Sequence, residues 1–231
     1  MSGEDELRAV TERYARRGGA DRYSPLRPEV CHTLHERQRA LLRMFAARGI
    51  TDLATHRLVE VGCGSGGNLL EMLRLGCAPG HLTGIELLPE RLAQARLVLP
   101  QGVTLIGGDA VTAPIAPASQ DLVLQATVFS SLLDDAFQQQ LADAMWRWLK
   151  PGGAVLWYDF TIDNPRNPDV RGVPLARVRE LFAQGVVSAQ RVTLAPPLAR
   201  AAGRIHPGLV PALNVLPWLR THVLAWIAKP E

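Results

Sequence analysis

Short apolar runs alternate with amphipathic segments along most of the chain. Between His32 and Arg48 the apolar residues recur at helical spacing and Gly49 follows them, so a helix is predicted there. The later runs that predict strands are Leu58–Val61, Leu82–Glu86, Val103–Ile106, Leu122–Leu124, Ala154–Phe160 and Val186–Leu194. The segments that predict helices are Gly67 to about Leu75, one beginning near Pro89, Asp134–Leu149 and one near Leu175–Ala183. Strands that alternate with helices pair in parallel, because each return crosses a face of the sheet, so a doubly wound α/β fold is expected.

Both ends of this α/β region carry segments of a different character. The first thirty residues are polar and contain Pro25 and Pro28, which disfavour a continuous helix. We interpret residues 1–50 as an N-terminal arm and helix that act as a lid, with Tyr14 and Tyr23 closing over a bound ligand. Residues 51–231 are expected to form the ligand-binding domain, in which a stretch interrupted by prolines and glycines, at about 195–217, covers the second substrate.

Composition narrows the class of protein. The 231 residues are 47% hydrophobic and 20% charged, which excludes a disordered tail, a fibre and a disulfide-stapled miniprotein. The formal net charge is only +3 and the basic residues are dispersed, so no nucleic-acid partner is expected. The acidic start does not resemble a signal peptide and no apolar run is long enough to span a membrane, so a cytoplasmic location is expected. Three cysteines without C-x-x-C spacing support neither disulfides nor a metal site.

A glycine-rich turn follows the first predicted strand and opens the next helix. Glycine is required where the backbone turns with positive φ or approaches a ligand closely, so this turn is expected to bind one. Gly62, Gly64 and Gly67 satisfy G-x-G-x-x-G, and Glu86 follows Gly67 by 19 residues (86 minus 67), so a dinucleotide site has to be considered. Glu60 changes this picture, because a carboxylate beside the turn favours a cationic group and repels a pyrophosphate.

Two more acids end the next two strands. Glu86 has the two oxygens needed to accept both hydroxyls of a ribose, and Asp109 is able to accept a hydrogen bond from an adenine amino group. Together with Glu60 they describe a site for adenosine with a zwitterionic tail.

At this point the chain resembles the class I S-adenosylmethionine-dependent methyltransferases. The likeness covers about residues 57–160 and includes the first motif from Glu60 to Gly66, the acid Glu86, Gly108-Asp109-Ala110, and a Pro151-Gly152-Gly153 turn. It implies a Rossmann-like sheet of seven strands, mostly parallel, whose last strand, within Leu219–Ala228, is antiparallel. It also implies S-adenosylmethionine as cofactor. The residues expected to bind it are Glu60, Gly62, Cys63, Gly64, Gly66, Glu86, Leu87, Asp109, Ala110 and Gln125.

The acceptor is expected beyond the carboxyl ends of the fourth and fifth strands. Asp159 is the predicted catalytic base or acceptor anchor, although a buried aspartate bonded to loop amides is an equally open reading. A polar loop punctuated by two Asn-Pro steps follows it, and His206 lies in the cap. The residues expected to bind the acceptor are Asn164, Arg166, Asn167, Arg171 and His206.

The sequence therefore predicts transfer of a methyl group to a small-molecule or glycan acceptor, at an oxygen of a sugar or sugar-phosphate-type group. Two alternatives stay open. An NAD(P)-dependent oxidoreductase would explain the glycine spacing and Glu86 but not Glu60, and a non-catalytic cofactor-binding module would keep the same pocket. The identity of the acceptor and the oligomeric state do not follow from these residues.

Overall fold

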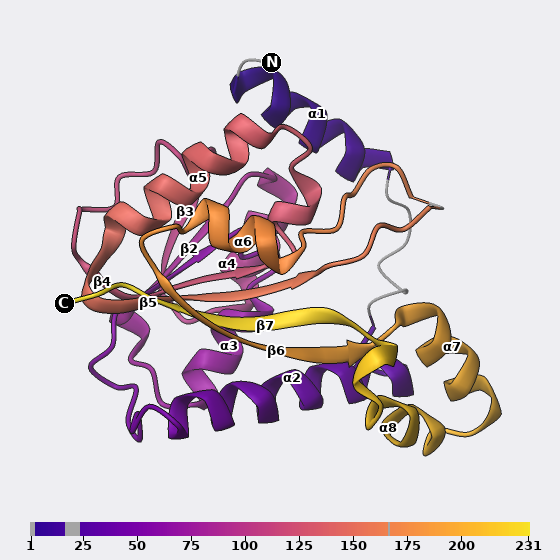
Figure 1. Ribbon diagram of the computed structural model, residues 1–231. Coiled ribbons are helices and arrows are strands. Elements are labelled where there is room, and N and C mark those ends of the chain that lie inside the picture. Colours follow the sequence, from indigo (N-terminus) through magenta and orange to yellow (C-terminus); the bar gives the residue numbers. More distant parts are fainter. Residues whose placement is uncertain (1–2, 17–23, 166) are drawn as a thin grey trace.

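The chain forms one seven-stranded sheet covered by helices on both faces (Figure 1). The computed structural model describes residues 3–16, 24–165 and 167–231. The strands are β1 (Leu58–Val61), β2 (Leu82–Glu86), β3 (Thr104–Gly107), β4 (Gln120–Ala126), β5 (Leu149–Phe160), β6 (Val186–Leu194) and β7 (Arg220–Ala228). The helices are α1 (Gly3–Arg16), α2 (Pro28–Ala46), α3 (Gly67–Arg74), α4 (Pro89–Val98), α5 (Asp135–Trp148), α6 (Leu175–Leu181), α7 (Pro196–Ile205) and α8 (Leu209–Asn214), with short 3-10 turns η2 (Pro79–His81), η3 (Phe129–Ser131) and η4 (Pro217–Leu219).

The strand order is β3-β2-β1-β4-β5-β7-β6. The pairs from β3 to β5 are parallel, and β7 runs antiparallel to both β5 and β6. The predicted fold class is confirmed: a doubly wound sheet of seven strands, mostly parallel, with an antiparallel last strand. The order reverses between β1 and β4, and open α/β sheets bind their ligands at such a point, beyond the carboxyl ends of the strands.

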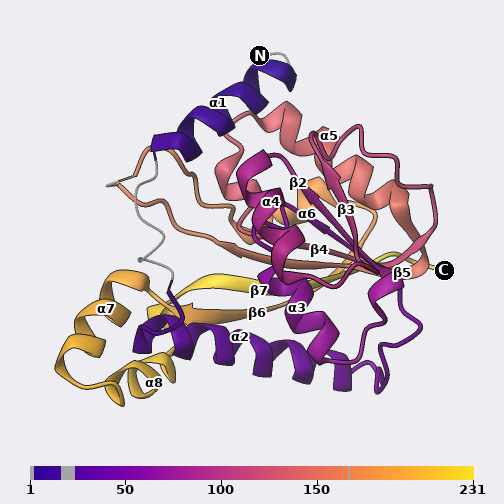
Figure 2. The same cartoon turned by 180° about the vertical axis from the view of Figure 1, so that it is seen from behind.

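Alternating residues of the central strands fill two apolar layers. One layer, under α5 and α6, contains Val59, Val61, Val123, Val155 and Trp157. The other, under α2, α3 and α4, contains Leu58, Leu122, Leu124, Ala154 and Leu156. Figures 1 and 2 show these helices on opposite sides of the sheet. The period of two follows from the pleat, and strands buried on both faces read as nearly continuous apolar runs.

The structure corrects the expected ends of the chain. Residues 3–16 form the helix α1, which the polar composition and the later prolines did not suggest. Both prolines lie beyond it, and Pro28 begins α2, because proline fits the first position of a helix, where no N–H partner is needed. The stretch at 195–217 holds α7 and α8, of ten and six residues, and its expected role as a cap over the acceptor stays a prediction. In the described part of the chain, no helix is both long and apolar enough to cross a membrane.

Candidate functional site

The turn after β1 depends on glycine at three positions. Gly62, Gly64 and Gly66 have φ angles of 64°, 56° and 86°, in the left-handed region that L side chains rarely adopt. Space adds a second requirement at Gly62, where a Cβ would lie 2.6 Å from Cγ2 of Val128. At Gly66, which caps α3, a Cβ would lie 2.8 Å from Leu99. The chain can therefore bend from β1 into α3 only with glycines at these positions.

Glu86 joins this turn to the end of β2. Its Oε2 accepts a hydrogen bond from the Gly64 N–H at 2.7 Å, and its Oε1 accepts one from the Leu88 N–H at 2.9 Å. A carboxylate offers about four lone-pair sites, so these two bonds leave capacity for two further donors. Glu86 thus both fixes the glycine turn and remains able to accept hydroxyl groups of a ligand.

Glu60 lies in β1 on the face covered by α2 and α3, where the neighbouring position Leu58 is apolar. The side chain is fully buried. Its Oε1 accepts a hydrogen bond from Nδ2 of Asn68 at 2.6 Å, whereas its Oε2 has no partner. Burial raises the pKa of Glu60 to about 8, against the opposing effect of the Asn68 hydrogen bond. A buried carboxyl group with one free oxygen is suited to a cationic ligand group.

A positive side chain from α2 supports this carboxyl group indirectly. Arg37 donates from Nη2 to Oδ1 of Asn68, which orients the amide so that its Nδ2 donates to Glu60. The same guanidinium lies 3.6 Å from Glu71 and 5.0 Å from the centroid of the Tyr158 ring. Arg37 therefore fixes the hydrogen-bond direction at Glu60 without neutralising it by direct contact.

A pocket opens at the carboxyl ends of β1, β2 and β4. It is lined by five of the predicted cofactor-binding residues: Gly62, Glu86, Leu87, Asp109 and Ala110. Asp109 accepts a hydrogen bond at Oδ1 from the Val111 N–H at 2.9 Å, which shapes the turn after β3. The other predicted residues, Glu60, Cys63, Gly64, Gly66 and Gln125, do not line it. Cys63 is buried, and its Sγ occupies the space where a Cβ on Gly84 would lie, so it packs the turn from behind.

The opposite wall of the pocket follows β4 and contains a strained residue. Thr127 has a φ of 59°, an outlier for a β-branched side chain. Its N–H donates to the Tyr158 carbonyl at 2.8 Å, and the buried Gln125 accepts from the Val128 N–H at 3.1 Å. Gln125 therefore holds the turn that places Thr127 and Val128 in the pocket wall, rather than lining the pocket itself.

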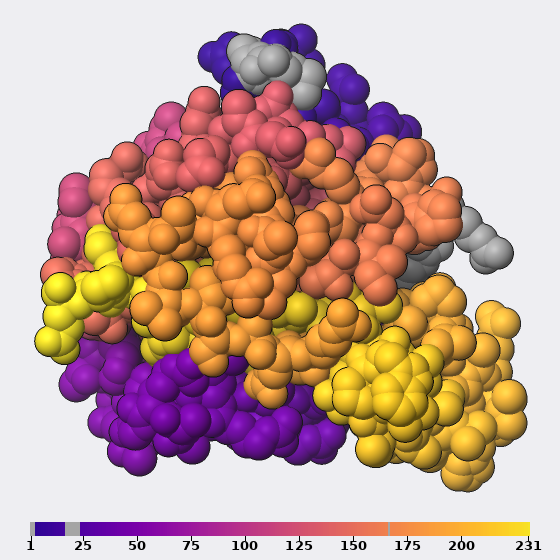
Figure 3. Space-filling model, in the orientation of Figure 1, coloured from indigo at the N-terminus to yellow at the C-terminus, as the bar shows by residue number. Residues whose placement is uncertain are grey.

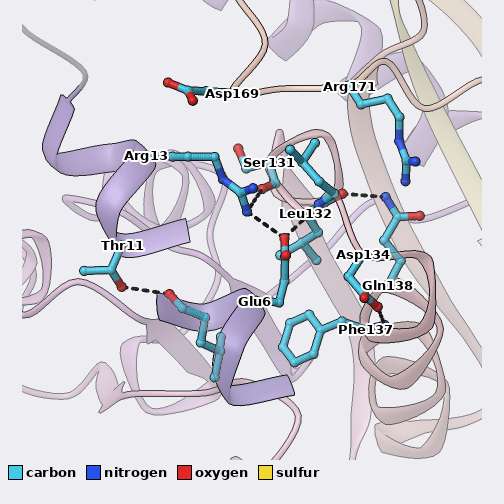
Figure 4. Close-up of polar contacts among 12 residues, drawn as sticks. Glu6, Thr11, Arg13, Ser131, Leu132, Asp134, Phe137, Gln138, Asp169 and Arg171 are labelled. Carbon is cyan, nitrogen blue, oxygen red and sulfur yellow. Dashed lines mark hydrogen bonds and ion pairs between the residues drawn. The ribbon is translucent and has the colours of Figure 1, made fainter. Parts of the chain in front are cut away.

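The N-terminal helix α1 forms one wall of the pocket. Leu7, Val10 and Tyr14 line it. Within the helix, Nη2 of Arg13 lies 2.6 Å from Oε1 of Glu6 in a buried ion pair, and the same Nη2 donates to the Ser131 carbonyl at 3.2 Å (Figure 4). Oε1 of Glu6 also accepts from the Leu133 N–H at 2.8 Å.

The aromatic ring of Tyr14 is fixed at both of its ends. Its hydroxyl lies 3.2 Å from Oγ of Ser131, and the Arg91 guanidinium lies 4.7 Å from the ring centroid. The expected closure by Tyr14 is thus consistent with its place in the pocket wall, while Tyr23 lies outside the described residues.

Comparisons with known proteins agree with this geometry. Residues 58–153 match the family model described as a methyltransferase domain. A SAM-dependent methyltransferase from Archaeoglobus fulgidus has the same fold, with 12% identity, a TM-score of 0.59, and 83% of this chain and 94% of that chain covered. Residues 58–153 therefore form a methyltransferase domain, and the chain has the fold of S-adenosylmethionine-dependent methyltransferases. This confirms the resemblance and the class of cofactor expected from the sequence.

Other methyltransferases resemble the chain in fold. Phosphoethanolamine N-methyltransferase 2 of Haemonchus contortus, in complex with S-adenosylmethionine, is 18% identical with a TM-score of 0.61, over 84% of this chain and 52% of that one. A putative methyltransferase of Haloferax volcanii, in complex with the Trm112 activator, is 20% identical with a TM-score of 0.60, over 87% and 91%.

A curated protein of unassigned function is closer in sequence. It is the uncharacterized 37.1 kDa protein in transposon TN4556 of Streptomyces fradiae, 30% identical over 165 residues, or 68% of this chain. The chain spans only 46% of the length of that relative.

The residues of this methyltransferase fit the cofactor of the family. The unpartnered Oε2 of Glu60 matches an ammonium group, the spare acceptor capacity of Glu86 matches ribose hydroxyls, and the glycine turn leaves room where a side chain would stand. When bound there, the cofactor would supply an activated sulfonium methyl group. The residues that would hold it in the pocket are Gly62, Glu86, Leu87, Asp109 and Ala110, with Tyr14 and Thr127 in the same lining, whereas Glu60 would act from outside that lining, beside the glycine turn.

Asp159 is fully buried at the end of β5 and does not line the pocket. Its Oδ2 accepts from the Ser130 N–H at 3.1 Å and its Oδ1 from the Phe160 N–H at 2.9 Å. Burial raises the pKa of Asp159 to about 7. This placement favours the reading of a buried aspartate bonded to loop amides over that of a base in contact with the acceptor.

The predicted acceptor loop is tied to its neighbours more than the sequence suggested. Arg171 pairs with Asp135 of α5, and Asn167 accepts at Oδ1 from the Asp169 N–H at 3.2 Å. Asp169 in turn lies 2.8 Å from Nη2 of Arg16 in α1. These pairs connect the loop to α1 and α5. Asn164 lies in the same loop, and Arg166 lies outside the described residues.

His206 lies apart from that loop, in the exposed turn between α7 and α8, where its Nδ1 accepts from the Gly208 N–H at 3.0 Å. This hydrogen bond is local and shapes the turn. The expectation that His206 binds the acceptor therefore stays a prediction.

Several residues of the pocket were not assigned to the cofactor from the sequence. Leu7, Val10 and Tyr14 recur at helical spacing, i, i+3 and i+7, and that pattern is the signal that would have revealed α1. The other pocket-lining residues that were not assigned to the cofactor are Val61, Ile85, Leu88, Arg91, Gly108, Ala126, Thr127, Val128, Ser131, Leu132, Phe137 and Leu141.

Gly62→Ala tests whether the close approach at the turn is required. A Cβ would add a clash with Val128 to a left-handed backbone, which alone costs about 1–2 kcal/mol. We expect the affinity for S-adenosylhomocysteine, measured by calorimetry, to fall by about tenfold or more, roughly 1.4 kcal/mol. Gly67→Ala is the matched control, because nothing lies within 4 Å of a Cβ there, and it should bind nearly as the wild type does. Equal affinities of the two variants would contradict this account.

Asp159→Asn distinguishes an anchoring aspartate from a catalytic one. The amide has one acceptor oxygen in place of two, so a buried N–H of Ser130 or Phe160 loses its partner, at a cost of about 1–3 kcal/mol in the free energy of unfolding. Urea denaturation measures this loss. Asp163→Asn is the control, since the exposed Asp163 accepts from the Gly172 N–H where water can replace it. Unchanged stability together with a large loss of turnover would instead support the catalytic prediction.

Proposed function

We propose that the protein transfers the methyl group of S-adenosylmethionine to a small-molecule or glycan acceptor, at an oxygen of a sugar or sugar-phosphate-type group. The observation that carries the cofactor half of this proposal is the buried carboxyl group of Glu60, whose Oε2 has no partner beside a glycine turn. A pyrophosphate-bearing dinucleotide would bring negative charge to this carboxyl group, whereas an ammonium group would pair with it. The match to the methyltransferase domain model supports the same choice.

The chemistry asks the protein for placement rather than for a nucleophile. Glu60 and Glu86 orient the two ends of the cofactor, and α1 with Tyr14 limits the access of water to the pocket. Holding the two reactants in line at about 3–3.5 Å contributes roughly 7–11 kcal/mol to lowering the barrier. The rigid supports of Thr127, from Gln125 and the Tyr158 carbonyl, suit that task.

The acceptor side is supported by polar groups at the same edge of the sheet. The hydroxyls of Thr127 and Ser131 belong to pocket-lining residues, and Asn164 and Asn167 lie in the loop after β5. Hydroxyl and amide groups can both donate and accept hydrogen bonds, and so can the hydroxyl groups of a sugar. These side chains therefore suit a methyl acceptor that is rich in hydroxyl groups. Arg171 is expected to contribute less to binding of an anionic acceptor than its charge suggests, because its guanidinium already pairs with Asp135.

A panel of acceptors tests the proposed reaction. The purified chain is incubated with S-adenosylmethionine and with sugars, sugar phosphates, amines and phosphoethanolamine in turn, and release of S-adenosylhomocysteine is measured. We expect release to depend on a hydroxyl-bearing acceptor and to be lost in Gly62→Ala. Release that depends only on an amine would overturn the oxygen acceptor. If NADH binds tightly and S-adenosylhomocysteine does not bind, the oxidoreductase reading replaces the whole proposal.

The protonation state of Glu60 gives a second test, which needs no acceptor. With a pKa of about 8 the carboxyl group is mostly protonated at pH 7, and pairing with an ammonium group would ionise it. Binding should therefore release up to about one proton per site at pH 7, and the affinity should rise as pH rises toward 8. Calorimetry in buffers of different ionisation enthalpy measures the proton.

Glu60→Gln is the control for this measurement, because the amide cannot ionise. Its binding should be weaker, and Glu60 should account for the difference in proton release between the two proteins. Identical proton release by the wild type and the variant would show that Glu60 does not face the cation. The sign for stability is opposite: since the pKa in the folded chain exceeds the ordinary 4.5, ionisation of Glu60 lowers the stability of the free protein as pH rises from about 4.5 to about 8.

A further inference from the structure

The segment between β6 and β7 forms a helical hairpin, α7–α8, followed by the turn η4. Because β6 ends and β7 begins at the carboxyl edge of the sheet, the hairpin stands at the same edge as the cofactor pocket. It projects beside the start of α2 (Figures 1 and 3). Its inner side packs on a small cluster of its own, which contains Leu194, Ala199, Ala202 and Val210.

The hairpin and the turn η4 expose large apolar side chains. Ile205 is 79% exposed, Val215 70% and Trp218 71%. On α7, Leu198, Ala201 and Ile205 follow the spacing i, i+3 and i+7, which puts them on one stripe of the helix, and this stripe borders the side that buries Ala199 and Ala202. The hairpin is therefore amphipathic, and its packing inside does not require these outer residues.

The charges that the hairpin segment itself carries are all of one sign. The sequence has no aspartate or glutamate from residue 181 to residue 230, whereas Arg200, Arg204 and Arg220 fall within or beside the hairpin. Arg204 is exposed and directly precedes Ile205. The carboxylate that reaches the hairpin from outside is Glu29 of α2, close to Gly203, and it lies 3.7 Å from Arg27.

We propose that the α7–α8 hairpin and η4 dock on the surface of an anionic lipid membrane. Exposed leucine, isoleucine and tryptophan side chains enter the boundary between headgroups and acyl chains, and the arginines pair with lipid phosphates. A protein partner or a second copy of the chain would equally cover apolar side chains, but the absence of acidic residues from this stretch of sequence favours a uniformly negative surface. The proposal does not depend on which acceptor receives the methyl group.

Vesicle sedimentation tests the proposal with the full chain. Phosphatidylcholine vesicles with and without phosphatidylglycerol are mixed with the protein, and the bound fraction is measured at low and high salt. We expect binding to the phosphatidylglycerol vesicles, weakened about tenfold or more by Ile205→Ser with Trp218→Ser, and weakened by salt and by Arg204→Gln. The double variant alters exposed side chains only, so its thermal unfolding should match that of the wild type.

A second helix provides the matched control. On α4, Leu97 is 85% exposed beside the exposed Arg96, but Glu90 lies on the same helix. Arg96→Gln with Leu97→Ser should leave vesicle binding unchanged. Equal loss of binding in this control, or no binding of the wild type to either vesicle, would overturn the proposal. It would also be overturned by a dimer in sedimentation velocity that the Ile205 and Trp218 variant abolishes, since the occupant would then be a second copy of the chain.

Discussion

The cost of burying one carboxyl group organises the centre of this protein. Glu60 lies in β1, and its side chain points into the apolar layer under α2 and α3, as that of Leu58 does two residues earlier. An ionised carboxylate without partners is expensive there, so the group is kept protonated by burial and bonded through one oxygen to Asn68. Asn68 comes from α3 and is oriented by Arg37 from α2. Three elements are thereby placed around a single side chain that has one oxygen left for a ligand.

Backbone strain at two strand ends completes the pocket. Gly62 after β1 and Thr127 after β4 both have positive φ, and Val128 lies so close to Gly62 that no side chain fits between them. Glycine adopts this conformation freely, but a β-branched residue such as Thr127 keeps it only where surrounding contacts over-determine it. Glu86 fixes the glycine turn by accepting from Gly64 and Leu88, and Gln125 fixes the turn at Thr127 by accepting from Val128. Hydrogen bonds within the fold consequently hold both turns of the pocket.

Local patterns allowed much of this site to be predicted, and long-range contacts account for the rest. The glycine turn, Glu86 and Asp109 were found because the chemistry of each is written in a few neighbouring residues at the end of a strand. Gln125 was assigned to the same site by position, but its amide is used inside the fold. Asp159 was ambiguous for the same reason, since a buried anchor and a catalytic base have the same sequence signature.

Helix α1 was missed because what holds it lies far away in the chain. Arg13 donates a hydrogen bond to the carbonyl of Ser131, and Glu6 accepts one from the N–H of Leu133. Both partners lie more than 100 residues away in the chain, so the sequence around α1 does not predict these contacts. The polar sequence of α1 argues for an exposed arm, yet its two most important charges are buried against each other (Figure 4).

This buried pair is better understood as a device for position than as a source of stability. Taking two charges out of water costs about as much as their attraction returns, whereas leaving one of them unpaired costs roughly 3–5 kcal/mol. Any docking of α1 that moves Glu6 away from the Leu133 N–H, or Arg13 away from the Ser131 carbonyl, leaves a buried polar group without its partner and is therefore strongly disfavoured. With that register fixed, Tyr14 has one place to go, between Arg91 and Ser131 in the wall of the pocket. The contacts of Glu6 and Arg13 with the segment after β4, far from the glycine turn, thus place the ring of Tyr14 in the wall of the pocket.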